Sequence, residues 1–120
     1  MQLTDHFTQN ELACKCGCGR CDMRGSFLAK LEKFRIAWGK PMSIVSGFRC
    51  EAKNLSLKNA AKNSPHIRGR AVDVRVRGSF ERYMFLKLAF AQGFGGIAVN
   101  RTTVHLDDRP LSDPRSWHYY

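Results

Sequence analysis

Two histidines and one aspartate constrain the fold of this 120-residue chain more than any other feature. His66 and Asp73 stand seven residues apart around Gly69, a separation that a tight turn between two short extended segments can close. Residues 71–76 (AVDVRV) alternate with period two, which predicts a strand with Asp73 on a defined face. The residues around His105 follow the same pattern. Two neighbouring strands would place Asp73 and His105 side by side, with His66 reaching in from the turn.

Two imidazoles and a carboxylate are a ligand set that catalytic zinc uses, since three N/O ligands leave a fourth position open for water. A single histidine beside apolar residues is more often a packed or surface residue. An aspartate within a strand is less common, so Asp73 needs a partner there. Spacing alone leaves both the zinc interpretation and the structural one open.

The motif Ser64-x-His66-x-x-Gly69-x-Ala71-x-Asp73, followed by a strand with His105, resembles the zinc site of a known family. This is the D-Ala-D-Ala carboxypeptidase and murein endopeptidase family, which shares its fold with the Hedgehog signalling domain. The resemblance covers nearly the whole chain, and its opening segment is similar to short, phage-encoded members. The further matching segments are Phe7, Glu11 and 14–19; 41–50 with Asn54; 93–97; 104–107; and 115–117.

The resemblance implies a zinc peptidase that hydrolyses peptidoglycan stem peptides or crosslinks, in phage lysis or wall penetration. His66, Asp73 and His105 would hold the Zn²⁺, which acidifies a water molecule and polarises the scissile carbonyl. Arg49 would bind a substrate carboxylate through two parallel hydrogen bonds, although a surface ion pair is the alternative for this residue. Ser64 would bind the substrate backbone or cap the turn, and these two roles stay open.

One departure from the family concerns the general base. Many relatives have a glutamate three residues before the last zinc histidine, where this chain has Thr102. Asp107 follows His105 by two residues, so both side chains share one strand face and Asp107 is the candidate catalytic base. Alternatively, Asp107 supports the site structurally. Some Hedgehog-type domains keep the zinc and only bind, so a non-catalytic zinc-containing module for wall or protein binding is the competing function.

The cysteines allow several interpretations. Four of the five lie within eight residues, and these are Cys14, Cys16, Cys18 and Cys21. They could hold a second, structural zinc, remain reduced thiols, or contribute a disulfide to Cys50. Cys50 directly follows Arg49, so a tether there would help to hold the arginine. The odd number leaves at least one thiol free or paired between molecules.

The charge of the chain is strongly positive, with 20 Lys and Arg against 10 acidic residues. A net charge of +10 steers a molecule toward polyanions. The basic residues are dispersed and accompany no known nucleic-acid motif, so we expect no nucleic-acid partner. Anionic polymers of a bacterial wall fit the same charge, and so does a merely solubilising surface.

Length and composition predict a single domain, 1–120, which we expect to be monomeric. No apolar run approaches the roughly 20 residues of a membrane-spanning helix, and the first residues lack the basic and apolar parts of a secretory signal peptide. We therefore expect synthesis in the host cytoplasm and action at the wall, reached through lysis or as part of a virion.

The residue pattern predicts an α+β fold, a small and mostly antiparallel sheet with flanking helices. A capping box at 8–11 opens a short helix, and an apolar stripe at Phe27, Leu31, Phe34 and Trp38 marks a helix that ends at Gly39. A second long helix should run from Ser79, as its cap, through Ala91, and bury Phe80, Tyr83, Met84 and Leu88. The remaining predicted elements are a strand at 42–45, a helix at 51–61, and hairpin strands at 97–99 and 102–106.

Overall fold

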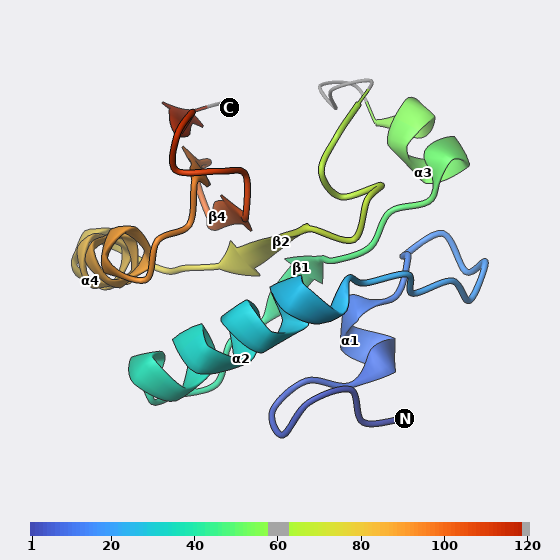
Figure 1. Ribbon diagram of the computed structural model, residues 1–120, viewed down its shortest axis with the longest axis horizontal. Helices are drawn as coiled ribbons and strands as arrows, with labels where there is room; N and C mark the ends of the chain where they lie inside the picture. Colours follow the sequence, from blue (N-terminus) through green and yellow to red (C-terminus); the bar gives the residue numbers. More distant parts are fainter. Residues whose placement is uncertain (58–62, 119–120) are drawn as a thin grey trace.

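The computed structural model describes residues 1–57 and 63–118 and shows a five-stranded sheet with packed helices (Figure 1), the α+β class that was predicted. None of the helices in these two ranges is long and apolar enough to span a bilayer. The elements are α1 (Gln9–Leu12), α2 (Gly25–Trp38), β1 (Ile44–Ser46), α3 (Glu51–Ser56), β2 (Ala71–Arg75), α4 (Ser79–Ala91), β3 (Gly96–Val99), β4 (Thr103–Asp107) and β5 (Arg115–His118).

The strands lie in the order β1-β2-β4-β3-β5. Neighbours pair antiparallel except β3 and β5, which run parallel. The predicted order of elements is confirmed up to β4, whereas β5 was not predicted. Arg115–His118 is polar and largely exposed, so its sequence lacks the alternation of a buried strand. Its backbone pairing with β3 makes it an edge strand.

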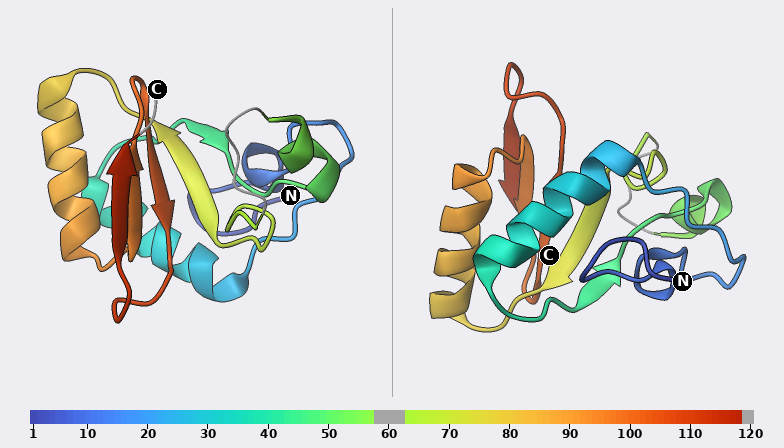
Figure 2. Two further views of the ribbon diagram at one scale, coloured as in Figure 1. Left: turned by 90° about the horizontal axis from the view of Figure 1, so that it is seen from above. Right: turned by 60° about the horizontal axis from the view of Figure 1, so that its bottom comes forward.

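The two long helices, α2 and α4, pack together against one face of the sheet, as the two views of Figure 2 indicate. Because side chains alternate along a strand, every second residue of β2 and β4 faces these helices. The intervening residues, which include Asp73, His105 and Asp107, point to the opposite face. The buried side chains on the helix side include Phe27, Leu31, Phe34, Val72, Val74, Phe85, Ala89, Ile97, Val104 and Leu106.

Several local signals are confirmed. Thr8 and Glu11 form the capping box, with Glu11 N–H donating to Thr8 Oγ1 (3.3 Å) and Thr8 N–H donating to Glu11 Oε1 (3.0 Å). Gly39 ends α2 in the left-handed conformation, at φ 77°. The hairpin of β3 and β4 has the predicted position, with Asn100 N–H donating to the carbonyl of Thr103 across the turn (2.9 Å).

The prediction for α4 was right in extent and wrong in its cap and its buried face. Gly78, not Ser79, is the N-cap, and no side chain caps the helix. Phe85 and Ala89 are buried, four residues apart on one face. Phe85 packs edge-on against Phe34 of α2, with ring centroids 5.0 Å apart. Of the predicted apolar face, Leu88 packs partly on the core, while the exposed side chains are Phe80 (79%), Tyr83 (66%) and Met84 (39%).

Two further predictions had inaccurate bounds. The strand expected at 42–45 is Ile44–Ser46. The helix expected at 51–61 is Glu51–Ser56, because Leu57 is already extended, at φ −91° and ψ 130°. The last part of that prediction, 58–61, lies outside the described residues.

Candidate metal centre

The sheet brings the predicted ligands together. Asp73 of β2 and His105 of β4 are direct partners in the antiparallel register, as the sequence predicted. One carboxylate oxygen, Asp73 Oδ1, lies 3.0 Å from His105 Nδ1 and 3.3 Å from His66 Nε2. The three candidate ligand atoms all lie within 4.8 Å of one another. Both imidazoles are buried, so the site lies below the surface of the sheet face opposite the helices.

The turn that carries His66 depends on Ser64 and Gly69. His66 N–H donates to Ser64 Oγ (3.2 Å), so the hydroxyl caps the turn, which was one of its two predicted roles. Gly69 has φ 68°, which L side chains rarely adopt. A Cβ atom there would also lie 2.0 Å from the carbonyl oxygen of Asp22. The glycine lets the chain reverse closely enough to return from His66 to Asp73.

Hydrogen bonds outside the ligand set fix the orientation of each imidazole. His66 Nδ1 lies 2.8 Å from the carbonyl oxygen of Gly47, an acceptor, so this nitrogen carries the proton and Nε2 faces the site. His105 Nε2 lies 2.7 Å from Asp107 Oδ2, which leaves Nδ1 to face Asp73. Acceptors of this kind set the tautomer of metal-binding histidines and raise their basicity as ligands.

Asp107 is fully buried and held on several sides. It shares the strand face of His105, as predicted, and also accepts two hydrogen bonds from the Arg109 guanidinium (2.9 and 2.7 Å) and one from the Arg109 backbone N–H (3.1 Å). Gly96 of β3 is its cross-strand partner. A Cβ atom at Gly96 would lie 2.1 Å from Asp107 Oδ1, so the missing side chain makes the space for this carboxylate.

The hydrogen bonds of this network shift the pKa values of the buried carboxylates and of His105. Burial alone would raise the pKa of Asp73, but hydrogen bonds from His105 and His66 hold that pKa well below its ordinary value. Burial likewise opposes ionisation of Asp107, whereas hydrogen bonds from His105 and Arg109 lower its pKa. Burial would lower the pKa of His105, but hydrogen bonds to Asp107 and Asp73 raise it. Both carboxylates are therefore anionic at neutral pH.

Arg49, the predicted substrate-binding residue, lies at the same site. It follows β1, and its side chain is largely buried. Its Nη1 donates to Asn54 Oδ1 (2.8 Å), and its Nη2 lies 3.7 Å from Asp73 Oδ2. The alternative of a surface ion pair does not describe this buried position. The structure thus places the guanidinium directly beside the candidate metal ligands.

Sequence reasoning missed three contributors to the site. The carbonyl of Gly47 has no side-chain signal, since backbone acceptors cannot be recognised from residue type. Arg109 could have been found, because a cation two residues after a candidate carboxylate can pair with it. The Trp117 ring lies with its centroid 5.2 Å from that of His105 and 4.8 Å from the Arg109 guanidinium carbon. Its position depends on β5, whose sequence pattern is weak.

The space for Asp107 gives a first testable prediction. Gly96→Ala should destabilise the protein by about 1–3 kcal/mol, the usual cost of overpacking, and weaken metal binding by about 10- to 100-fold through displacement of Asp107. Thermal unfolding and metal titration measure the two effects. Gly25→Ala is the matched control, because a Cβ atom there meets nothing within 4 Å. Equal stability and metal affinity in the two variants would contradict the role of Gly96.

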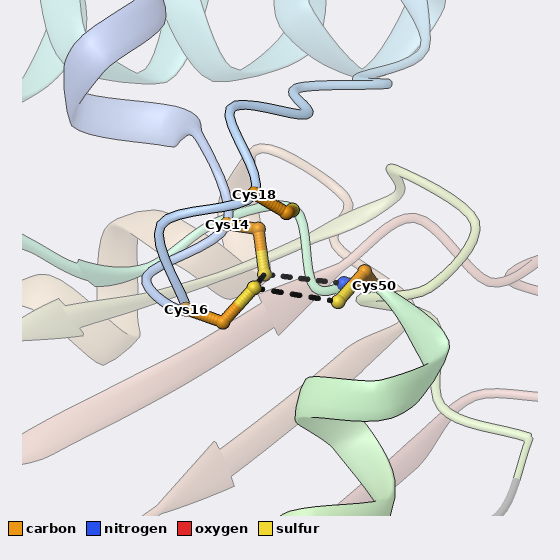
Figure 3. A group of neighbouring side chains, drawn as sticks. All are labelled: Cys14, Cys16, Cys18 and Cys50. Atoms are coloured by element: carbon orange, nitrogen blue, oxygen red, sulfur yellow. Dashed lines mark hydrogen bonds between the residues drawn. The ribbon is translucent and has the colours of Figure 1, made fainter.

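A second group of side chains could hold a metal (Figure 3). Its members are Cys14, Cys16, Cys18 and Cys50, with ligand atoms within 4.8 Å of one another. The predicted set of four was wrong in one member: Cys21 is outside this group and packs partly against the main core. All five cysteines are free thiols in the structure, so the alternative disulfide to Cys50 is not formed.

The centre of His66, Asp73 and His105 fits zinc by the chemistry of its donors. Two neutral imidazole nitrogens and an anionic oxygen are ligands that Zn²⁺ accepts, and three protein ligands are the number found in hydrolytic sites. The buried acceptors Gly47 O and Asp107 already orient both rings. The donor set therefore needs only small adjustments to hold the ion.

Comparison with known proteins agrees with this site. A search of curated proteins found no significant match. The sequence profile described as Peptidase M15 matches residues 5–107, a segment that contains all three candidate ligands and Arg49. Peptidases of this family are zinc-dependent. The chain therefore belongs to the peptidase M15 family, the zinc D-Ala-D-Ala carboxypeptidase family.

Proposed function

We propose that the protein is a zinc peptidase that hydrolyses peptidoglycan stem peptides or their crosslinks, as a DD-carboxypeptidase or an endopeptidase. The observation that carries this proposal is the convergence of His66, Asp73 and His105 on one point, with the guanidinium of Arg49 beside them. Family membership supports the chemistry, and the arginine supports a substrate that carries a carboxylate.

The three ligands have distinct tasks. His66 and His105 each offer one ring nitrogen, and the Gly47 carbonyl and Asp107 fix the orientation of the two rings. Asp73 supplies the negative charge, since hydrogen bonds from His105 and His66 hold its pKa below the ordinary value. When bound, zinc would act as a Lewis acid on the scissile carbonyl and activate water for attack. The chain itself provides the rigid, buried arrangement that this chemistry needs.

Arg49 is the proposed anchor for the substrate. Its hydrogen bond to Asn54 fixes the plane of the guanidinium, and its position beside Asp73 aims it at the site. With Asp73 serving as a metal ligand, the guanidinium of Arg49 would be available to pair with another carboxylate. Stem peptides carry a terminal carboxylate and side-chain carboxylates, and a bidentate contact with one of them would orient the amide bond.

For Asp107, we infer the role of a positioning residue, in preference to the catalytic base that the sequence suggested. Its carboxylate is fully buried and already accepts hydrogen bonds from His105 and Arg109. A base has to reach a water molecule at the reacting centre. The observed contacts instead match a carboxylate that orients a metal-binding histidine.

Asp107→Asn distinguishes these two roles. A positioning role predicts zinc affinity lower by about 10- to 100-fold, with most of kcat recovered at saturating zinc. A general base predicts unchanged zinc affinity and a kcat lower by about 10²- to 10⁴-fold at any zinc concentration. Zinc titrations monitored by both binding and hydrolysis separate the outcomes, and the second result would overturn our assignment.

Digestion of purified muropeptides, followed by mass spectrometry, tests the proposed function. A carboxypeptidase removes the terminal D-Ala from stem peptides, and an endopeptidase converts crosslinked dimers to monomers. Unchanged muropeptides that nevertheless bind the zinc-loaded protein would favour the competing function, a non-catalytic recognition module. Cleavage of either kind supports a peptidase, whereas binding without cleavage supports only the substrate class.

The charge of +10 supports a wall location for the activity. We propose that anionic wall polymers raise the local concentration of the protein, that it acts as a monomer, and that it serves phage lysis or wall penetration. Binding to isolated wall material should weaken as salt rises, because exposed charges are screened. Specific, tight binding to DNA with a steep salt dependence would instead revive the nucleic-acid alternative.

A further inference from the structure

Four thiols from two separate segments of the chain are arranged as a second ligand set. Cys14, Cys16 and Cys18 lie on the loop after α1, and Cys50 lies at the start of α3. Figure 3 shows the side chains of Cys14, Cys16 and Cys50 turned toward one another, with Cys18 beside them. Sγ of Cys16 lies 3.4 Å from that of Cys14 and 3.6 Å from that of Cys50.

These distances suit one tetrahedral ion. Zinc binds thiolate sulfur at about 2.3 Å, which separates the sulfurs of a tetrahedral site by roughly 3.8 Å. The four sulfurs lie within 4.8 Å of one another, so small movements complete the tetrahedron. Four thiolates form a closed ligand set with no open position, which is typical of structural sites.

The backbone around the thiols is already organised. The loop closes on itself through Cys14 N–H, which donates to the carbonyl oxygen of Arg20 (2.8 Å). Two sulfurs accept backbone hydrogen bonds: Cys14 Sγ from Cys50 N–H, and Cys50 Sγ from Lys53 N–H, both 3.4 Å long. Hydrogen bonds to sulfur stabilise the thiolate form that binds a metal.

We propose that Cys14, Cys16, Cys18 and Cys50 bind a structural Zn²⁺ that fixes the position of the Arg49 turn. Binding converts four thiols to thiolates and releases their protons to solvent, with no change in oxidation state. This second site is independent of the proposed peptidase activity. Its metal content can be measured whether or not the protein hydrolyses muropeptides.

The thiol site lies beside the segment that carries Arg49. Cys50 directly follows Arg49, and Phe48 N–H donates to the Leu12 carbonyl (2.8 Å), next to the same loop. The short segment 47–50 therefore carries the acceptor for His66, the guanidinium beside Asp73 and one thiolate. The loop after α1 is largely exposed, so few packing contacts hold it. A metal that ties Cys50 to this loop would hold the segment 47–50 in place.

Metal content of the purified, reduced protein tests the proposal. Parent protein should hold two zinc ions per chain, and His66→Ala should hold one. Cys18→Ser should also hold one, and it should retain the ion at His66. Because Cys18 is exposed, this variant should fold. Cys21→Ala is the matched control and should keep both ions, since Cys21 lies outside the group.

Spectroscopy and alkylation identify the ligands directly. With Co²⁺ in place of zinc, thiolate-to-metal charge-transfer absorption should be present in His66→Ala and absent or strongly reduced in Cys18→Ser. The exposed thiols Cys16 and Cys18 should resist alkylation until a chelator is added. Protection that a reductant removes and a chelator does not would indicate a disulfide and overturn the proposal. One zinc per chain in the parent, lost in His66→Ala and kept in Cys18→Ser, would also overturn it.

Discussion

Replacement of His66 by alanine should remove the ion from the histidine–aspartate centre and lower kcat/KM for muropeptide hydrolysis by at least about 10³-fold. A bound metal supplies several kcal/mol of transition-state stabilisation, and each ~1.4 kcal/mol corresponds to a factor of ten. The fold should persist, because His66 lies in a turn outside the main hydrophobic core. Metal analysis, circular dichroism and a muropeptide assay together measure the effect.

His6→Ala provides the control for this variant. His6 also pairs with a carboxylate, that of Glu32, but it lies outside both candidate metal groups. This control should keep its metal and its activity. Full hydrolysis by folded His66→Ala protein with no metal at the centre would rule out the zinc mechanism.

Removal of the Arg49 guanidinium has the second largest expected effect. Arg49→Ala should lower kcat/KM by roughly 30- to 1000-fold, because a charge-assisted bidentate contact contributes on the order of 2–4 kcal/mol to transition-state binding. Arg49→Lys should recover only part of the loss, since an ammonium lacks the planar fork. Steady-state kinetics with muropeptide substrates provide the measurement.

The zinc content of both Arg49 variants should equal that of the parent, which separates a substrate role from support of the metal. Lys33→Ala is a suitable control, because Lys33 is an exposed cation of α2, which packs on the other face of the sheet. Arg49→Ala that cleaves muropeptides as fast as the parent would show that another basic residue holds the substrate.

Strand periodicity predicted that two of the candidate ligands lie side by side, and the resemblance to the family identified them as metal ligands. Asp73 and His105 each lie in an alternating segment, so their shared face could be inferred before the register was known. Gly69 indicated the turn that returns His66 to the same point. The two helices that precede β1 were also predictable, since Thr8 caps the start of α1 and Gly39 ends α2.

Other features depend on contacts that no local pattern contains. Helix α4 carries apolar residues on several of its faces. The face that packs on Phe34 therefore could not be chosen from the sequence alone. β5 is a strand because β3 offers its edge, not because of its own residues. Cys50 replaces Cys21 in the thiol group, although it is 34 residues from Cys16, because the fold returns the chain to the loop.

Reconstitution of chelator-treated protein with zinc tests the central claim most directly. Hydrolysis of a stem peptide ending in D-Ala-D-Ala, or of crosslinked muropeptides, should be absent in the metal-free protein and return as the His66 centre is filled. The same titration with His66→Ala should restore no hydrolysis. Activity that is equal with and without zinc, or a zinc-filled centre that leaves every muropeptide intact, would contradict a zinc peptidase of the bacterial wall.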